Sequence, residues 1–270
     1  MTQPYGLLGV PSSAGAMTPG IDKAPQALRE AGLVEQLRQA GYHVNDHGDL
    51  SRTRYKPDKA HPTAQNVERV VHVATEVAKQ VSAMLDAGET PLVIGGDCSI
   101  SVGVVAGYAQ HDPGVLLLYM DGGLDLFTPE TKVELKGHLD SMGVAHMIGA
   151  AGVTEALSHI GTRFPLLSPE QVVYFAVYQG PPDDPEEVVL QKYAMRSYPV
   201  ETVHGRAKAA AVDALASIGA HPFIIHFDVD VIDFLDFPIS DIPSIDEGLS
   251  FSEAMDSLGV FAPARSLQGW

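Results

Sequence analysis

The sequence has few cysteines, few basic side chains and no long apolar run. Cys98 is the only cysteine in 270 residues, so no disulfide can form within the chain, and a reducing, cytoplasmic location is expected. Lysine and arginine number 17 against 34 aspartates and glutamates and form no cluster, which argues against nucleic-acid binding. No apolar run approaches the ~18 residues of a membrane span, and the first residues lack the pattern of a signal peptide.

The remaining composition is typical of a globular α/β protein. Apolar residues make up 45% of the chain, enough for a substantial core. The formal net charge of −17 suits solubility or cation binding. Proline-rich stretches at Gly180–Pro182 and Pro238–Pro243 indicate loops rather than linkers. We therefore predict a single domain over residues 1–270.

Short apolar runs alternate with helical patterns, which is typical of βαβ units around a parallel sheet. The clearest helix is predicted over Thr63–Ala87, where apolar residues recur every three to four positions, and another over Ser99–Gln110. Ser250 and Glu253 form a capping-box pattern that opens a helix reaching Leu258. The predicted strands are Tyr5–Val10, His43–His47, Pro91–Ile94, Val115–Met120, Val172–Val177, Ser197–Val200 and Pro222–Val229.

Side chains able to bind a cation lie at or just past the carboxyl ends of three of these strands. In chain order they are Cys98, Asp121, Asp125, His226, Asp228 and Asp230. Open α/β sheets place ligands at the carboxyl ends of their strands, so the four aspartates converge if the three strand ends are neighbours. Strand alternation puts His226, Asp228 and Asp230 on one face of the sheet.

A cluster of bare carboxylates is electrostatically costly. Two unit charges about 4 Å apart repel by roughly 4 kcal/mol at an effective dielectric constant of about 20. Such a cluster therefore requires a cation, protons or basic neighbours, and oxygen-rich sites suit Mn, Mg or Ca. Taken singly, each aspartate could instead do no more than cap a following helix.

The three segments resemble signature motifs of one enzyme family. Gly95-Gly-Asp-Cys-Ser99, Asp121-Gly-Gly-Leu-Asp125 and His226-Phe-Asp-Val-Asp230 are similar to Gly-Gly-Asp-His-Ser, Asp-Ala-His-x-Asp and Ser-x-Asp-x-Asp of the ureohydrolases, the arginase and agmatinase family. Further similar segments extend the resemblance from Tyr5 to Phe261. An ordered set of motifs is more specific than any one of them.

The resemblance implies a three-layer α/β/α sandwich around a parallel, eight-stranded sheet, and assembly into trimers or hexamers. Family members bind two Mn ions through two histidines and four aspartates, and water activated by the metal releases urea from a guanidine. By resemblance, Asp121 and Asp228 would bridge the two ions. Asp125 would complete the coordination of one ion, and Asp230 that of the other.

This chain departs from the family at its metal ligands. Cys98 stands where the first histidine belongs, and Mn prefers oxygen and nitrogen ligands to a thiolate. Gly123 replaces the second histidine and offers no ligand, so one ion would be held weakly. His226 replaces the signature serine and could act as a nitrogen ligand or a charge partner, or could only donate a hydrogen bond to a neighbouring loop.

The expected substrate-binding residues are altered as well. Phe127 stands where arginases have the asparagine that holds the amino-acid end of the substrate, so free arginine is not the expected substrate. Thr128 belongs to a segment that resembles the family's substrate loop. Asp184 and Glu187 keep acidic character where the substrate's amino end is expected.

Two further differences concern catalysis. Asp140, close to His138, replaces the histidine that shuttles protons in the family, and could act as an acid or base if its pKa is raised, or could be a solvated loop residue. The family's last strand, which carries an active-site glutamate, is expected to be missing from this chain, which ends at Trp270.

These observations favour a metal-dependent hydrolase that cleaves C–N bonds in a small guanidino or amidine compound other than free arginine. The expected cofactor is Mn, as one or two ions. A second reading is a metal-free enzyme on the same scaffold, with Asp140, His138 and His226 doing acid–base work. A third is a non-catalytic relative that assembles with an active homologue. A homo-oligomer is expected, with no nucleic-acid or membrane partner.

Overall fold

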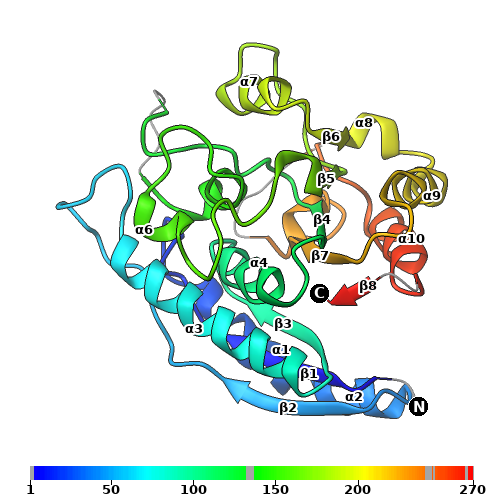
Figure 1. The fold of residues 1–270 in the computed structure, drawn as a ribbon. Coiled ribbons are helices and arrows are strands. Elements are labelled where there is room, and N and C mark those ends of the chain that lie inside the picture. The colour runs from blue at the N-terminus through cyan, green and yellow to red at the C-terminus, as the bar shows by residue number, and fades with distance from the viewer. Residues whose placement is uncertain (1–2, 132–136, 241–244, 246, 265–266, 270) are drawn as a thin grey trace. The chain divides into compact units, whose positions relative to one another are not determined.

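The computed structural model describes residues 3–131, 137–240, 245, 247–264 and 267–269 (Figure 1). It divides into two compact units. The first consists of Met1–Pro113 and Phe127–Leu166, and the second of Gly114–Leu126 and Leu167–Trp270. The predicted organisation as a single domain stays a prediction.

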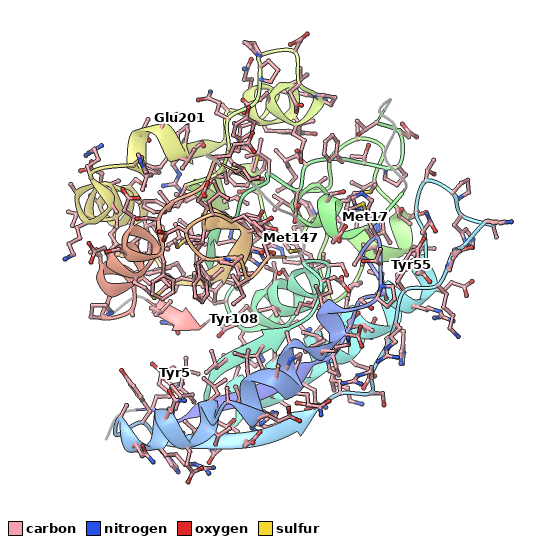
Figure 2. All side chains as sticks on the ribbon, turned by 180° about the vertical axis from the view of Figure 1, so that it is seen from behind. Tyr5, Met17, Tyr55, Tyr108, Met147 and Glu201 are labelled. Carbon is pink, nitrogen blue, oxygen red and sulfur yellow. The ribbon has the colours of Figure 1, made fainter. Side chains whose placement is uncertain are left out.

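The first unit is built on a parallel three-stranded sheet with strand order β2-β1-β3. Its strands and α-helices are β1 (Tyr5–Val10), α1 (Ala24–Glu30), α2 (Leu33–Gln39), β2 (Val44–Asp49), α3 (Val67–Asp86), β3 (Thr90–Gly95), α4 (Ile100–His111), α5 (Gly143–Met147) and α6 (Glu155–Ser158). Short 3-10 helices span Ile21–Lys23 and Asp140–Met142. Figure 2 labels Tyr108 and Met147, two of its buried side chains.

Helices α3 and α4 pack tightly against one another. The predicted apolar face of α3 is buried, and the helix begins only after Asn66, whose left-handed φ of 56° is incompatible with an α-helix. Two glycines of α4 face α3, and a Cβ at Gly103 would collide with the carbonyl of Ala74. A Cβ at Gly107 would collide with the side chain of Val81 in the same way. Glycine is therefore required for this close approach.

The second unit is built on a parallel five-stranded sheet with strand order β6-β5-β4-β7-β8. Its strands and α-helices are β4 (Leu116–Met120), β5 (Val172–Phe175), α7 (Pro185–Lys192), β6 (Arg196–Tyr198), α8 (Val200–Val203), α9 (Ala207–Ile218), β7 (Phe223–Phe227), α10 (Phe251–Phe261) and β8 (Leu267–Gly269). Short 3-10 helices, η3 and η4, span Pro169–Gln171 and Val229–Val231. Leu116, Leu118 and Met120 share one hydrophobic core with buried residues of α9 and α10. Strand alternation turns Leu117 and Tyr119 to the opposite face of this sheet.

Most predicted elements are present, with shifted ends that have local causes. Strand β5 stops at Phe175 because Ala176 has a left-handed φ of 64°. Strand β6 stops before Pro199, which precedes α8. The capping box at Ser250 and Glu253 is confirmed and opens α10.

The expectation that no strand follows the last helix is wrong. β8 lies after α10 and pairs in parallel with β7, Phe223 lying opposite Leu267. Its sequence is Leu-Gln-Gly, so the described strand does not carry the glutamate that the resemblance places there. The described residues thus form eight strands, three in one sheet and five in the other. No helix in the described part of the chain is long and apolar enough to cross a membrane.

Candidate metal centre

Two predicted ligands leave neighbouring strands of the second unit side by side. Strands β4 and β7 pair in parallel, with Met120 opposite Phe227. Asp121 follows β4 and Asp228 follows β7, and the Asp228 amide donates to the Met120 carbonyl at 2.8 Å. Asp121 is 3% exposed. The carboxyl ends of these strands therefore bring the two carboxylates together, as predicted.

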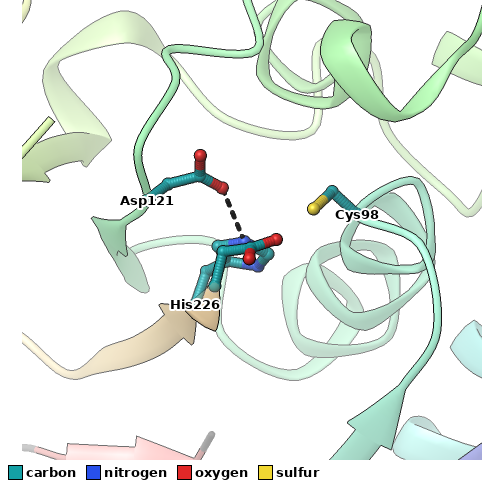
Figure 3. Close-up of side chains that lie close together, drawn as sticks. Cys98, Asp121 and His226 are labelled. Carbon is teal, nitrogen blue, oxygen red and sulfur yellow. Dashed lines mark hydrogen bonds and ion pairs between the residues drawn. The ribbon is translucent and has the colours of Figure 1, made fainter. Parts of the chain in front are cut away.

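His226 faces the same carboxylates. Its Nε2 lies 3.1 Å from Oδ2 of Asp121. Figure 3 marks this interaction with a dashed line. Possible ligand atoms of Asp121, His226 and Asp228 all lie within 4.8 Å of one another. Burial lowers the pKa of His226 to about 4, against the opposing charge of Asp228. The imidazole is therefore neutral near pH 7 and can either ligate a metal or donate to Asp121.

Asp230 reaches this group by a route that differs from the predicted one. Strand β7 ends at Phe227 and Asp230 lies in η4, so strand alternation does not extend to it. Its Oδ1 nevertheless accepts a hydrogen bond from the Gly122 amide at 2.8 Å. Burial raises the pKa of Asp230 well above its usual value, and the negative charges of Asp121 and Asp228 raise it further.

Several hydrogen bonds hold the loop that follows β4. The Gly123 amide donates to Oδ1 of Asp121 at 2.7 Å. Asp125 is 8% exposed and has a left-handed φ of 51°, a conformation that aspartate tolerates better than most residues. The Leu126 amide donates to Oε1 of Glu186 on α7 at 2.7 Å. Glu186 lies in the acidic stretch between Asp184 and Glu187, but no motif predicted this contact.

Tyr119 is a second residue that the motifs did not reveal. Its ring is fully buried, and its hydroxyl donates to Oδ2 of Asp125 at 2.5 Å. It precedes Asp121 by two positions, so strand alternation, continued one residue past β4, predicts both side chains on one face of the sheet. That alternation was the available signal.

In the first unit, the Gly-Gly-Asp-Cys segment follows β3. Asp97 is 2% exposed and accepts hydrogen bonds from Ser12 Oγ at 2.9 Å, from the Gly15 amide at 3.2 Å and from Ser99. It therefore ties the exit of β3 to the exit of β1. Cys98 is partly buried in the turn before α4. Its role as a metal ligand stays a prediction.

His138 and Asp140 form a pair in the first unit. His138 Nδ1 lies 2.6 Å from Asp140 Oδ1, which also accepts from the Ser141 amide at 2.9 Å. Burial raises the pKa of the Asp140 carboxyl, and the charge of Asp97 adds to this while the bond to His138 opposes it. The direction of this shift is the one that an acid role for Asp140 would need.

The predicted substrate-binding residues fall in both units. In the first, Thr128 is buried and its hydroxyl lies 3.2 Å from that of Thr131, while Phe127 is partly buried. In the second, Asp184 caps α7 by accepting from the Glu186 amide at 2.8 Å, so this carboxylate already has a structural role. Glu187 is 2% exposed, and its pKa is raised by burial and by the charges of Asp184 and Glu201.

A separate hollow of about 610 Å³ opens on the second unit. Its lining contains none of the predicted site residues and consists of Tyr178, Val200, Glu201, His204, Asp233, Leu235, Asp236, Glu247, Gly248 and Ser250.

Comparison with known proteins agrees with the geometry. A sequence model described as the arginase family matches residues 3–269. The arginase of Brevibacillus brevis is 30% identical over 270 residues, which cover 99% of this chain and 88% of that protein. The solved arginase from Bacillus caldovelox has a TM-score of 0.90 at 26% identity, covering 99% of this chain and 89% of that one. A Trypanosoma cruzi formiminoglutamase variant with Mn shares the fold, with a TM-score of 0.74 at 19% identity over 99% of this chain and 83% of its own. The predicted α/β fold is therefore confirmed.

Proposed function

Because this chain belongs to the arginase family, we propose that it is a divalent-metal-dependent hydrolase of C–N bonds. The proposed substrate is a small guanidino or amidine compound other than free arginine. Phe127 supports this restriction, because an aromatic ring cannot replace the asparagine that the resemblance expects at the amino-acid end. Mn is the proposed metal and a homo-oligomer the proposed assembly.

The observation that carries the proposal is the accumulation of negative charge at the exits of β4 and β7. The raised pKa of Asp230, caused first by burial and then by Asp121 and Asp228, reflects charge that a cation would neutralise. Neutral His226 adds a nitrogen donor to these oxygen donors. A set of carboxylates with one imidazole suits Mn and the neighbouring transition metals. The donor set therefore fits the metal that the family uses.

The resemblance distributes the ligands between two ions. Asp121 and Asp228 would contact both, Asp125 one and Asp230 the other. Gly123 supplies no ligand, so we expect one ion to bind more weakly than the other. The proposed role of Cys98 rests on its position in the motif alone. When bound, the metal lowers the pKa of water towards neutrality, which provides a nucleophile at neutral pH.

The proposed proton donor to the leaving nitrogen is Asp140. Its raised pKa means that the carboxyl keeps a proton at higher pH than an ordinary aspartate does. The hydrogen bonds from His138 and Ser141 both fall on Oδ1, so Oδ2 is the proposed proton carrier. His138 fixes the orientation of the carboxyl group.

Metal content tests the proposal directly. The protein purified without chelator should contain one or two Mn, Ni, Zn or Co ions per chain by elemental analysis. After chelation, adding each metal alone should raise the midpoint of thermal unfolding. Asp228→Asn should abolish most of this rise, because one carboxylate shared by both proposed ions is lost. Asp256→Asn is the matched control, since Asp256 pairs with Lys208 at 3.1 Å on exposed helix surfaces.

Activity is measured on the same preparations. A panel of guanidino and amidine compounds should release urea or ammonia only in the presence of metal, with free arginine among the poorest substrates. A protein that responds to no metal would contradict the proposal. Turnover without metal that is lost in Asp140→Asn would support the metal-free acid–base enzyme in its place.

A further inference from the structure

Three aromatic rings lie in a row across the second unit's sheet, directly before the carboxylates. Tyr119 of β4 lies opposite Tyr174 of β5 on one side and His226 of β7 on the other. The rings of Tyr119 and Tyr174 meet edge to face, with centroids 5.7 Å apart. The rings of Tyr119 and His226 stack with centroids 4.1 Å apart and planes inclined by 6°. The imidazole therefore rests on the tyrosine ring.

The same tyrosine reaches the loop that carries another carboxylate. Its hydroxyl donates to Oδ2 of Asp125, at 2.5 Å, a distance typical of a strong bond from a hydroxyl to an ionised carboxylate. Asp125 lies two positions after Gly123 and has a left-handed backbone. A carboxylate in such a loop depends on contacts from outside the loop for its orientation. Tyr119 supplies one of those contacts from a rigid central strand.

We propose that Tyr119 is a positioning residue that sets the orientation of two metal ligands at once, His226 through its ring and Asp125 through its hydroxyl. This inference rests on the proposed function, since it assumes that both side chains ligate a cation. Groups that orient metal ligands commonly change metal affinity 10–100-fold when they are removed. The two contacts of Tyr119 are made by different parts of one side chain, so the hydroxyl contact can be removed while the stack is kept.

Tyr174 provides a matched control. Its ring is also fully buried, and its hydroxyl donates at 2.7 Å to the carbonyl of Leu124 in the same loop. Tyr174→Phe therefore removes a buried phenolic hydroxyl of equal size. It leaves the Asp125 carboxylate and the stacked His226 ring untouched. A loss of affinity caused only by loosening the core or the loop would appear in this variant as well.

The experiment compares the chelated full-length proteins by calorimetric titration with MnCl₂ alone. Tyr119→Phe keeps the stack and should raise the Kd for Mn by roughly tenfold or more. Tyr174→Phe should bind like the wild type. Tyr119→Leu removes both contacts and should weaken binding further. Equal weakening in Tyr119→Phe and Tyr174→Phe, or an unchanged Kd in Tyr119→Phe, would overturn the proposal.

A second readout does not depend on metal. In the chelated protein, proton NMR should show the ring protons of His226, assigned with His226→Gln, shifted upfield by the stacked tyrosine. The shift should persist in Tyr119→Phe and disappear in Tyr119→Leu. If the wild type binds no metal while the upfield shift is present, the proposed function fails and the aromatic support of His226 survives. If the shift is absent from the wild type, the positioning role fails even where metal binds.

Discussion

The backbone amide of Gly122 donates a hydrogen bond of 2.8 Å to Oδ1 of Asp230, a residue 108 positions later in the chain. This bond joins the loop after β4 to the short helix after β7. It fixes Asp230 beside Asp121 although the strand that was expected to carry Asp230 has already ended. The proximity of the loop after β4 and the short helix after β7 therefore depends on this backbone hydrogen bond as much as on strand alternation.

Restoring a histidine at position 123 should strengthen metal binding. A Cβ at Gly123 would lie 3.5 Å from Asp121 Oδ1 and 3.9 Å from Asp125 Oδ1, both ordinary contact distances, and the backbone there is not left-handed. We expect Gly123→His to raise the number of Mn ions bound per chain, or to lower the Kd for Mn by about tenfold, which is the order of magnitude by which single groups around a metal change its affinity. Calorimetric titration and elemental analysis measure both quantities.

The neighbouring glycine is the control for this gain. A Cβ at Gly122 would meet the Asp230 carbonyl and carboxylate at 3.1 Å, which is closer than an ordinary contact. Gly122→Ala should therefore weaken metal binding or leave it unchanged. An equal gain in both variants would show that a general stiffening of the loop, and not the imidazole, is responsible.

Protonation of His146 should make the protein unstable in acid. His146 is fully buried, its Nδ1 lies 2.7 Å from the Met142 carbonyl, and its Nε2 accepts from the Thr154 amide at 3.0 Å. A second proton would eliminate that acceptor, and burial lowers the pKa to about 4. The unfolded state, with a pKa near 6.5, takes up this proton first as the pH falls. The contribution of neutral His146 to the free energy of unfolding is therefore fully present above about pH 6.5 and is lost progressively towards pH 4.

The lost free energy of unfolding should amount to about 3 kcal/mol by pH 4, at ~1.4 kcal/mol per pKa unit. Urea denaturation between pH 4 and 7, which covers the interval between the two pKa values, measures it. His146→Gln, which cannot titrate, should show a flatter pH dependence and a lower stability at pH 7. A wild-type curve parallel to that of the variant would show that other groups cause the acid sensitivity.

Removing the Asp140 carboxyl should lower turnover more than substrate binding. If the carboxyl delivers a proton, Asp140→Asn should lower kcat by roughly 10²–10⁴-fold with a nearly unchanged KM, as general acids typically do. Steady-state kinetics on the best substrate of the panel measures this split. The control is Asp58→Asn, at an aspartate that is paired with exposed His61 at 2.9 Å in the same unit. An unchanged kcat in Asp140→Asn would exclude it as the proton donor.

Loss of the N-cap of α10 should lower the free energy of unfolding without changing catalytic activity. Ser250 Oγ accepts from the Glu253 amide at 3.2 Å, and the Glu253 side chain bonds back to Ser250. Ser250→Ala should lower the free energy of unfolding by about 1 kcal/mol. Ser252→Ala, at an exposed position of the same helix, should be neutral or slightly stabilising. Equal effects of the two substitutions would contradict a specific capping role.

The elements that were predicted well are those whose signal is local. Apolar runs located β1 and β4, periodicity located α3, and a four-residue pattern located the cap of α10. The end of β5 was misplaced because nothing in the sequence predicts the left-handed backbone of Ala176. β8 was missed because three residues, Leu-Gln-Gly, carry too little pattern, and only pairing with β7 makes them a strand.

The candidate site divides in a similar way. Charged residues at strand exits identified Asp121 and Asp228, since the topology of a parallel sheet brings such residues together. The contacts that orient them were not predicted, because they come from residues without a motif. From the sequence, Tyr119 looks like an ordinary core residue and Glu186 like an ordinary acidic residue at the start of α7. Their bonds to Asp125 and Leu126 appear only in the structure. Only the folded backbone reveals which distant partner each of them bonds.

The many bonds of Asp97 make the Gly-Gly-Asp tripeptide a poor sign of metal binding by itself. Its carboxylate holds Ser12, Gly15 and Ser99 together, so the turn after β3 needs an aspartate here whether or not the next residue binds a metal. An assignment of metal binding to this segment therefore has to rest on residue 98, which is cysteine here.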